Sequence, residues 1–199
     1  PCVLAFWRHA GFVPARLGLR VDPAGNLLIV EEAQDGGVCV FRIGGEAPHD
    51  FDYPVFSEPD GIPTGLSIHP SGLWAVYAAD GHLHRVSLNA NRLVFGSQTG
   101  TVEADGTPVD ATFTPDGKKV VVANEGEPDD GVDPEGSVSI IDVSKGAASA
   151  TVGTADFTAF DGREDTLRSR GVRIFPDATA SKDLEPEYVA VDARGRRAH

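Results

Sequence analysis

The chain lacks several features that define common protein classes. It has no methionine, only two cysteines (Cys2 and Cys39), and 17 Lys and Arg against 30 Asp and Glu in 199 residues. Two cysteines are too few for a disulfide scaffold or a zinc cluster, and their pairing stays open. The formal charge of −13 disfavours nucleic acid as a partner, because neutralising phosphates requires a surplus of basic side chains. Divalent cations are the more natural ligands.

Long apolar runs and familiar catalytic motifs are also missing. No apolar run approaches the roughly 18 residues of a membrane span, so we expect no such span. The sequence has no Gly-x-Ser-x-Gly elbow, no His-Glu-x-x-His, no phosphate-binding Gly-x-x-x-x-Gly-Lys-Ser/Thr and no dinucleotide fingerprint. These absences count against ordinary hydrolase and nucleotide-binding classes, and no catalytic residue is assigned.

Glycine (23) and proline (14) are abundant, and they mark a repeat. A short turn that ends in glycine precedes a run of branched apolar residues in three copies, and a fourth copy of the turn stands near the end of the sequence. The four glycines are 47, 45 and 78 residues apart: Gly25, Gly72, Gly117 and Gly195. Each full copy continues with a polar loop and an alternating strand. Four antiparallel strands every 45 or so residues are typical of a β-propeller blade.

The sequence therefore predicts an all-β chain of about three and a half four-stranded propeller blades. We expect blades at about 14–57, 62–97 and 107–153, with an outer strand of the second blade at 92–95. An insertion at 154–183 contains a short helix over 162–171 that Asp161 caps, and a fourth blade starts at 184–199.

Three and a half blades do not close a ring, since propellers have four to eight. We therefore expect self-association or missing blades, from another chain or from the rest of a longer protein. The blade number stays open.

Aligning the copies on their glycines brings polar residues to one predicted rim, around the central channel. Carboxylate and amide oxygens without nearby basic residues suit a hard cation such as calcium. The alternative is a solvated acidic surface. The predicted metal ligands are Glu32, Asp80, Asp110, Asn124, Glu125 and Glu187.

The densest acidic segment is 124–136. Its carboxylates would repel one another unless they are exposed, protonated or bridged by metal. The spacing is not that of an EF-hand, and a flexible solvated loop is the alternative. The secondary metal candidates here are Glu127, Asp129, Asp130, Asp133 and Glu135.

Long ordered motifs between about residues 108 and 192 resemble choice-of-anchor I domain proteins of bacteria. They lie at 114–128, 133–142, 157–163, 171–175 and 183–188. The resemblance implies a secreted or surface-attached propeller, extracellular or periplasmic, and some relatives are described as alkaline-phosphatase-like.

The leading hypothesis is a secreted calcium-binding propeller that hydrolyses phosphoric esters, with Glu125, Glu187 and their neighbours holding the cation. Two alternatives stay open. One is a non-catalytic binding or adhesion module for a surface ligand, and the other is a calcium-assisted, lactonase-like hydrolase acting on a small anionic ester.

Overall fold

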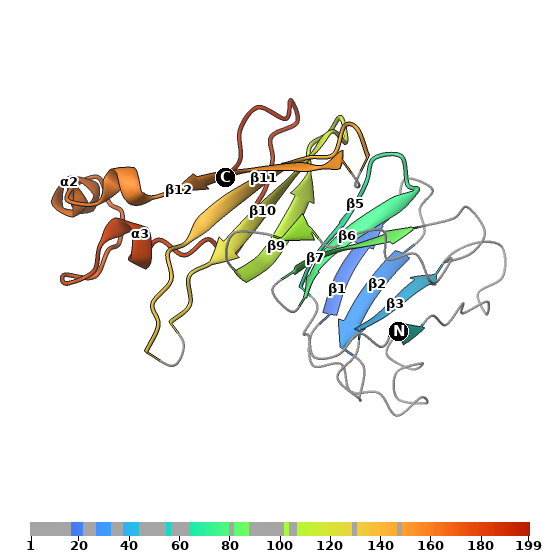
Figure 1. The fold of residues 1–199 in the computed structure, drawn as a ribbon, viewed down its shortest axis with the longest axis horizontal. Helices are drawn as coiled ribbons and strands as arrows, with labels where there is room; N and C mark the ends of the chain where they lie inside the picture. The colour runs from blue at the N-terminus through green and yellow to red at the C-terminus, as the bar shows by residue number, and fades with distance from the viewer. Residues whose placement is uncertain are drawn as a thin grey trace.

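The computed structural model describes residues 17–21, 27–32, 38–43, 55–56, 64–79, 82–87, 102–103, 107–128, 131–146 and 149–199, and the statements below concern these residues. They form three four-stranded antiparallel sheets with few helical turns, which confirms the all-β prediction (Figure 1). No helix in these ranges is long and apolar enough to cross a membrane.

Each sheet is a meander in which consecutive strands pair. The first sheet contains β1 (Leu17–Val21), β2 (Leu27–Glu32), β3 (Val38–Ile43) and β4 (Val55–Phe56). The second contains β5 (Thr64–Ile68), β6 (Trp74–Ala79), β7 (His82–Ser87) and β8 (Val102–Glu103). The third contains β9 (Thr107–Phe113), β10 (Lys119–Glu125), β11 (Ser137–Asp142) and β12 (Thr151–Asp156).

The fourth strand described in the second sheet is the two-residue β8, which pairs with β7. Residues 92–95, where we expected an outer strand, lie outside the described residues. A strand of two residues is too short to show an alternating pattern, so the sequence did not indicate β8.

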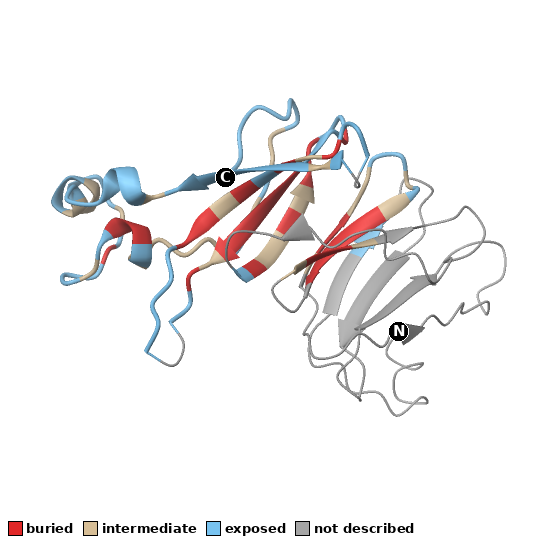
Figure 2. Ribbon diagram, in the orientation of Figure 1, coloured by how far each residue is buried: buried red, intermediate tan, exposed pale blue. Residues whose placement is uncertain are grey.

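The sheets stand side by side, and the first strand of each is the one nearest its neighbour. Strand β5 lies against both β1 and β9 (Figure 1). The second and third sheets enclose an apolar core, which Figure 2 shows as buried strands. Its members are Val76, Leu83, Ala111, Phe113, Val120, Val122, Ile141 and Val143. β-Branched residues dominate because β10 is buried on both faces.

The predicted repeat appears as one turn with the same hydrogen bonds in three copies. The amides of Gly72, Gly117 and Gly195 each donate to the carbonyl three residues earlier, all at 2.8 Å. Their φ angles are 69°, 70° and 65°, a region that favours glycine. In the fourth copy Asp192 N donates to Arg197 O at 2.9 Å, so residues 190–199 form the corresponding hairpin.

The segment after β12 contains a 3₁₀ turn, η2 (Thr158–Phe160), and the short helices α2 (Glu164–Ser169) and α3 (Ala180–Asp183). The predicted helix exists, but Asp161 does not cap it. Helix α2 begins after Arg163, without a side-chain cap, and the Asp161 carboxylate accepts hydrogen bonds from Ser181 N (2.8 Å) and Oγ (2.9 Å) instead. A tertiary partner 20 residues away takes the oxygen atoms that a local cap would use.

Candidate functional site

The loop between β10 and β11 is held in place by close backbone contacts at two of its three glycines, Gly126 and Gly136. A Cβ on Gly126 would lie 2.7 Å from Pro134 O, and one on Gly136 would overlap Leu184 O. Gly136 N also donates to Ser181 O at 3.1 Å. The segment 181–186 therefore crosses the base of the acidic loop, and only glycine leaves room for it.

This crossing gathers carboxylates from two parts of the chain. Burial raises the pKa of Glu185, and the nearby negative charges of four other carboxylates raise it further. We call these residues the acidic cluster: Glu125, Glu127, Asp133, Asp183 and Glu185. One cation is close by, since Lys182 Nζ lies 3.5 Å from an Asp133 carboxylate oxygen.

Asn124 lies at the end of β10 and is fully buried. Its Nδ2 donates to Ser137 Oγ at 3.0 Å and to Ser139 Oγ at 2.8 Å, while its Oδ1 has no hydrogen-bond partner. A buried acceptor without a donor costs about 1–3 kcal/mol. The amide therefore belongs to a small polar group inside the third sheet.

Asp110 and Glu187, two further predicted ligands, lie in different environments. Asp110 Oδ2 accepts a hydrogen bond from Val189 N at 2.9 Å, which ties the start of the fourth blade to β9. The backbone of Asp110 also lies against Gly65, where a Cβ would be 2.5 Å from its Cα. Glu187 is exposed.

The structure thus distributes the predicted ligands over several environments. In the described part of the chain, no three His, Cys, Asp or Glu side chains are arranged to hold a metal ion. Glu135 Oε1 lies 3.4 Å from Ser181 Oγ, whose shorter hydrogen bond goes to Asp161. The oxygen donors suit calcium in kind, but they do not form a coordination sphere. The predicted ligands Asp80, Asp129, Asp130 and the Glu32 side chain lie outside the described residues.

Two members of the acidic cluster, Asp183 and Glu185, were absent from the sequence prediction. They lie 58 and 60 residues after Glu125 in the chain, and the segment before them lacks the alternating strands of a blade. The motif at 183–188 that supported the family resemblance was the one available signal.

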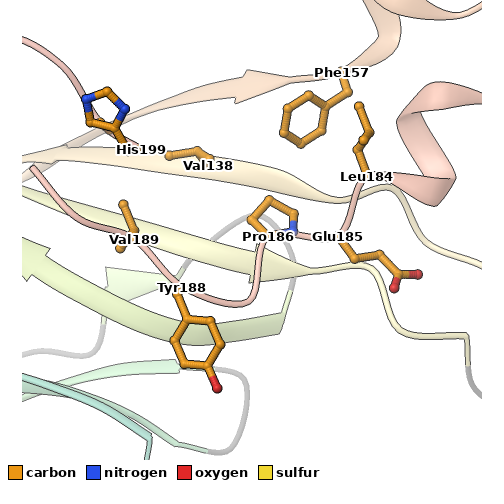
Figure 3. Close-up of a pocket in the computed structure, with 9 residues that line it drawn as sticks. Val138, Phe157, Leu184, Glu185, Pro186, Tyr188, Val189 and His199 are labelled. Atoms are coloured by element: carbon orange, nitrogen blue, oxygen red, sulfur yellow. The ribbon is translucent and has the colours of Figure 1, made fainter. Parts of the chain in front are cut away.

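A groove of about 420 Å³ lies beside the acidic cluster (Figure 3). Its walls are mostly apolar, and Glu185 lines it together with residues of β11 and of the last segment. The lining residues are Val138, Phe157, Leu184, Glu185, Pro186, Tyr188, Val189, Ala198 and His199. Tyr188 is 81% exposed, so the groove is open to solvent. A small ligand with an apolar body would fit it.

The two histidines of β7 lie close together, and one of them is buried. The His84 ring stacks on Tyr77 at 5.1 Å between centroids, and the His82 ring lies 6.3 Å from it. His84 therefore packs in the interior of the sheet as an aromatic ring.

The chain folds into three four-stranded meanders that stand side by side, with their first strands next to one another. This arrangement defines the class of protein: the chain is part of a β-propeller. Solved structures agree. Two putative 6-phosphogluconolactonases, from Bacteroides uniformis and Bacteroides fragilis, match with TM-scores of 0.58 and 0.57 at 16% and 19% identity, and each match covers 92% of this chain and 46% of that one. The β-propeller domain of Myceliophteria thermophila Cps50 (Swd1) matches with a TM-score of 0.56 at 10% identity, over 94% of this chain and 50% of that one.

The chain belongs to the choice-of-anchor I domain family, whose model matches residues 74–199. This confirms the resemblance seen in the motifs. No curated protein matches the sequence significantly. The chain spans about half the length of the solved propellers that it resembles.

Proposed function

We propose that the protein is a secreted or surface-attached propeller that binds calcium at the acidic cluster and uses it to hold a small anionic ester. The observation that carries the proposal is the packing of segment 181–186 against the loop at Gly136, which brings Asp183 and Glu185 to the carboxylates of that loop. Burial, and after it the charges of the other carboxylates, raises the pKa of Glu185. Membership of the choice-of-anchor I family supports the location.

The residues that would hold the ion are Glu125, Glu127, Asp133 and Glu185, with Asn124, Asp110 and Glu187 as the further predicted donors. Calcium accepts carboxylate and carbonyl oxygens in flexible geometry, and its charge would draw the cluster together. When bound, it would supply positive charge for a phosphate or carboxylate group. The apolar groove that starts at Glu185 would then hold the body of the ligand.

Calorimetric titration with calcium tests the site. We expect binding to the unmodified chain at pH 7.5, and at least about fivefold weaker binding in Glu127→Gln and Glu185→Gln, since each removes a ligand charge. Asp177→Asn, which removes an exposed carboxylate outside the cluster, is the control and keeps full affinity. No heat with calcium, or equal loss in the control, would contradict the site.

Turnover separates the chemistry from simple binding. We expect hydrolysis of an aryl phosphate that increases with calcium and falls in Glu185→Gln. The two Bacteroides proteins are described as putative 6-phosphogluconolactonases, so a phosphorylated sugar lactone is the second substrate to assay. Calcium binding without turnover of either substrate would contradict the hydrolase and favour the binding module.

A further inference from the structure

Ser181 connects two parts of the chain that are far apart in sequence, and it is only 1% exposed. Gly136 N, at the end of the acidic loop, donates to Ser181 O at 3.1 Å. On its other side, Ser181 donates to both carboxylate oxygens of Asp161, from N to Oδ1 at 2.8 Å and from Oγ to Oδ2 at 2.9 Å. Asp161 is therefore linked to the acidic loop through one buried residue. We call Asp161, Ser181 and Gly136 the Ser181 junction.

Glu164 strengthens the link on the Asp161 side. Its Oε1 accepts hydrogen bonds from Gly162 N at 2.9 Å and from Ala180 N at 3.1 Å. Gly162 follows Asp161 and Ala180 precedes Ser181, so the two carboxylates join the same two stretches of chain. Hydrogen bonds to an ionised acceptor are about twice as strong as those between neutral groups.

Apolar packing contributes little to the position of this region. The structure describes all of residues 157–183, and of these only Ile174, Ala180 and Ser181 are buried. Helix α2 has no buried residue, and Figure 1 shows α2 and α3 beyond the end of the third sheet. Because a segment without a core of its own has little else to hold it, its hydrogen bonds decide where it lies.

The junction lies directly before two members of the acidic cluster. Asp183 and Glu185 follow Ser181 by two and four residues. Between them, Leu184 O lies so close to Gly136 that an added Cβ would overlap it. The two carboxylates therefore reach the acidic loop only while segment 181–186 is docked there. At its far end the segment is tied by Val189 N, which donates to Asp110 Oδ2 at 2.9 Å.

We propose that Asp161 is a positioning residue of the acidic cluster. Through Ser181 it docks segment 181–186 on the acidic loop and so places Asp183 and Glu185 beside the carboxylates of that loop. The inference rests on the proposed function in one respect, that the docked carboxylates bind calcium. The ion pair of Lys182 with Asp133 cannot replace the junction, since both side chains are nearly half exposed and such pairs contribute little.

Three variants separate this role from that of a nearby charge. Asp161→Ala removes both acceptors of Ser181. Asp161→Asn removes the charge but keeps an oxygen for Ser181 N and an amide group that can donate to Ser181 Oγ. Asp156→Ala is the matched control, because the Asp156 carboxylate also accepts from the amide (3.0 Å) and the hydroxyl (2.5 Å) of one residue, Thr158, within its own stretch of chain.

Amide hydrogen exchange in the calcium-free protein tests the docking by itself. Gly136 N is the informative group, since its own acceptor, Ser181 O, is present in every variant. We expect its exchange to be about tenfold faster in Asp161→Ala, to increase less in Asp161→Asn, and to be unchanged in Asp156→Ala. Unchanged exchange in Asp161→Ala, or an equal increase in Asp156→Ala, would overturn the proposal.

Calorimetric titration of the same proteins with calcium tests the consequence for the site. We expect at least about fivefold weaker binding in Asp161→Ala, a change of less than about twofold in Asp156→Ala, and recovery of most of the affinity in Asp161→Asn. Equal weakening in Asp161→Ala and Asp161→Asn would mean that only the charge matters, and would overturn the positioning role. If the unmodified chain binds no calcium while Gly136 exchanges faster in Asp161→Ala, the proposed function is contradicted and the docking role is supported.

Discussion

The two ends of the third blade are built on opposite principles. At the turn end, the rings of His69, Trp74 and Phe113 pack against one another, and His69 Nε2 lies 3.1 Å from Gly117 O. At the loop end, the acidic cluster places five carboxylates with one lysine nearby. The first arrangement stabilises the fold. In the second, burial and neighbouring negative charge raise the pKa of Glu185, so its ionised form opposes folding.

The largest expected effect contrasts two aromatic residues, one at each end. Phe113 is 7% exposed, so Phe113→Ala should lower the free energy of unfolding by about 3–5 kcal/mol through lost packing. Tyr188 is 81% exposed, and Tyr188→Ala should change it by less than about 0.5 kcal/mol. Urea denaturation measures both. Similar losses in the two variants would show that the turn end is no more tightly packed than the loop end.

A pair of glycines with positive φ gives the second contrast. Gly117 (φ 70°) abuts the His69 ring, whereas Gly131 (φ 81°) has nothing within 4 Å of an added Cβ. Gly131→Ala should cost about 1 kcal/mol, the backbone strain alone. Gly117→Ala should cost about 3 kcal/mol, because the methyl group also overlaps His69. Thermal unfolding of both variants checks this, and equal costs would mean that the His69 ring shifts to accommodate the extra carbon.

The smallest expected effect is a gain in stability, whereas the substitutions above lower it. Because the pKa of Glu185 is raised, the folded chain favours its protonated form, and the charge opposes folding as the pH rises above about 4.5. Glu185→Gln should therefore stabilise the calcium-free protein by a few tenths of a kcal/mol at pH 7 and not at pH 3.5. Urea unfolding in a chelating buffer measures it. A loss of stability at pH 7 would show that the carboxylate makes a favourable contact.

Much of the architecture could be predicted because it is encoded locally. A glycine that needs a positive φ, placed before a run of branched residues, specifies a turn and the strand after it without reference to the rest of the chain. For this reason the repeats at Gly72, Gly117 and Gly195 all appear as the same hydrogen-bonded turn. Strand β8 was not predicted, because two residues are too few to show an alternating pattern.

The site was harder to predict, because aligning the repeats gives the position of a residue along its strand but not the face of the sheet to which its side chain points. Asn124 and Glu125 were aligned to one rim, yet consecutive residues of a strand point to opposite faces, and Asn124 turns into the sheet towards Ser139. Asp161 was assigned to the nearest helix on sequence, but its carboxylate binds Ser181. Neither contact has a local signature.

The sequence by itself therefore determined the blades, their turns and the excess of acid, because φ preferences and apolar periods act over a few residues. Only the tertiary structure decided that segment 181–186 lies against the loop after Glu125, and that His69 contacts Gly117 of the next sheet. Burial and charge interactions depend on which segments meet in space, and for this reason the raised pKa of Glu185 has no signature in the sequence.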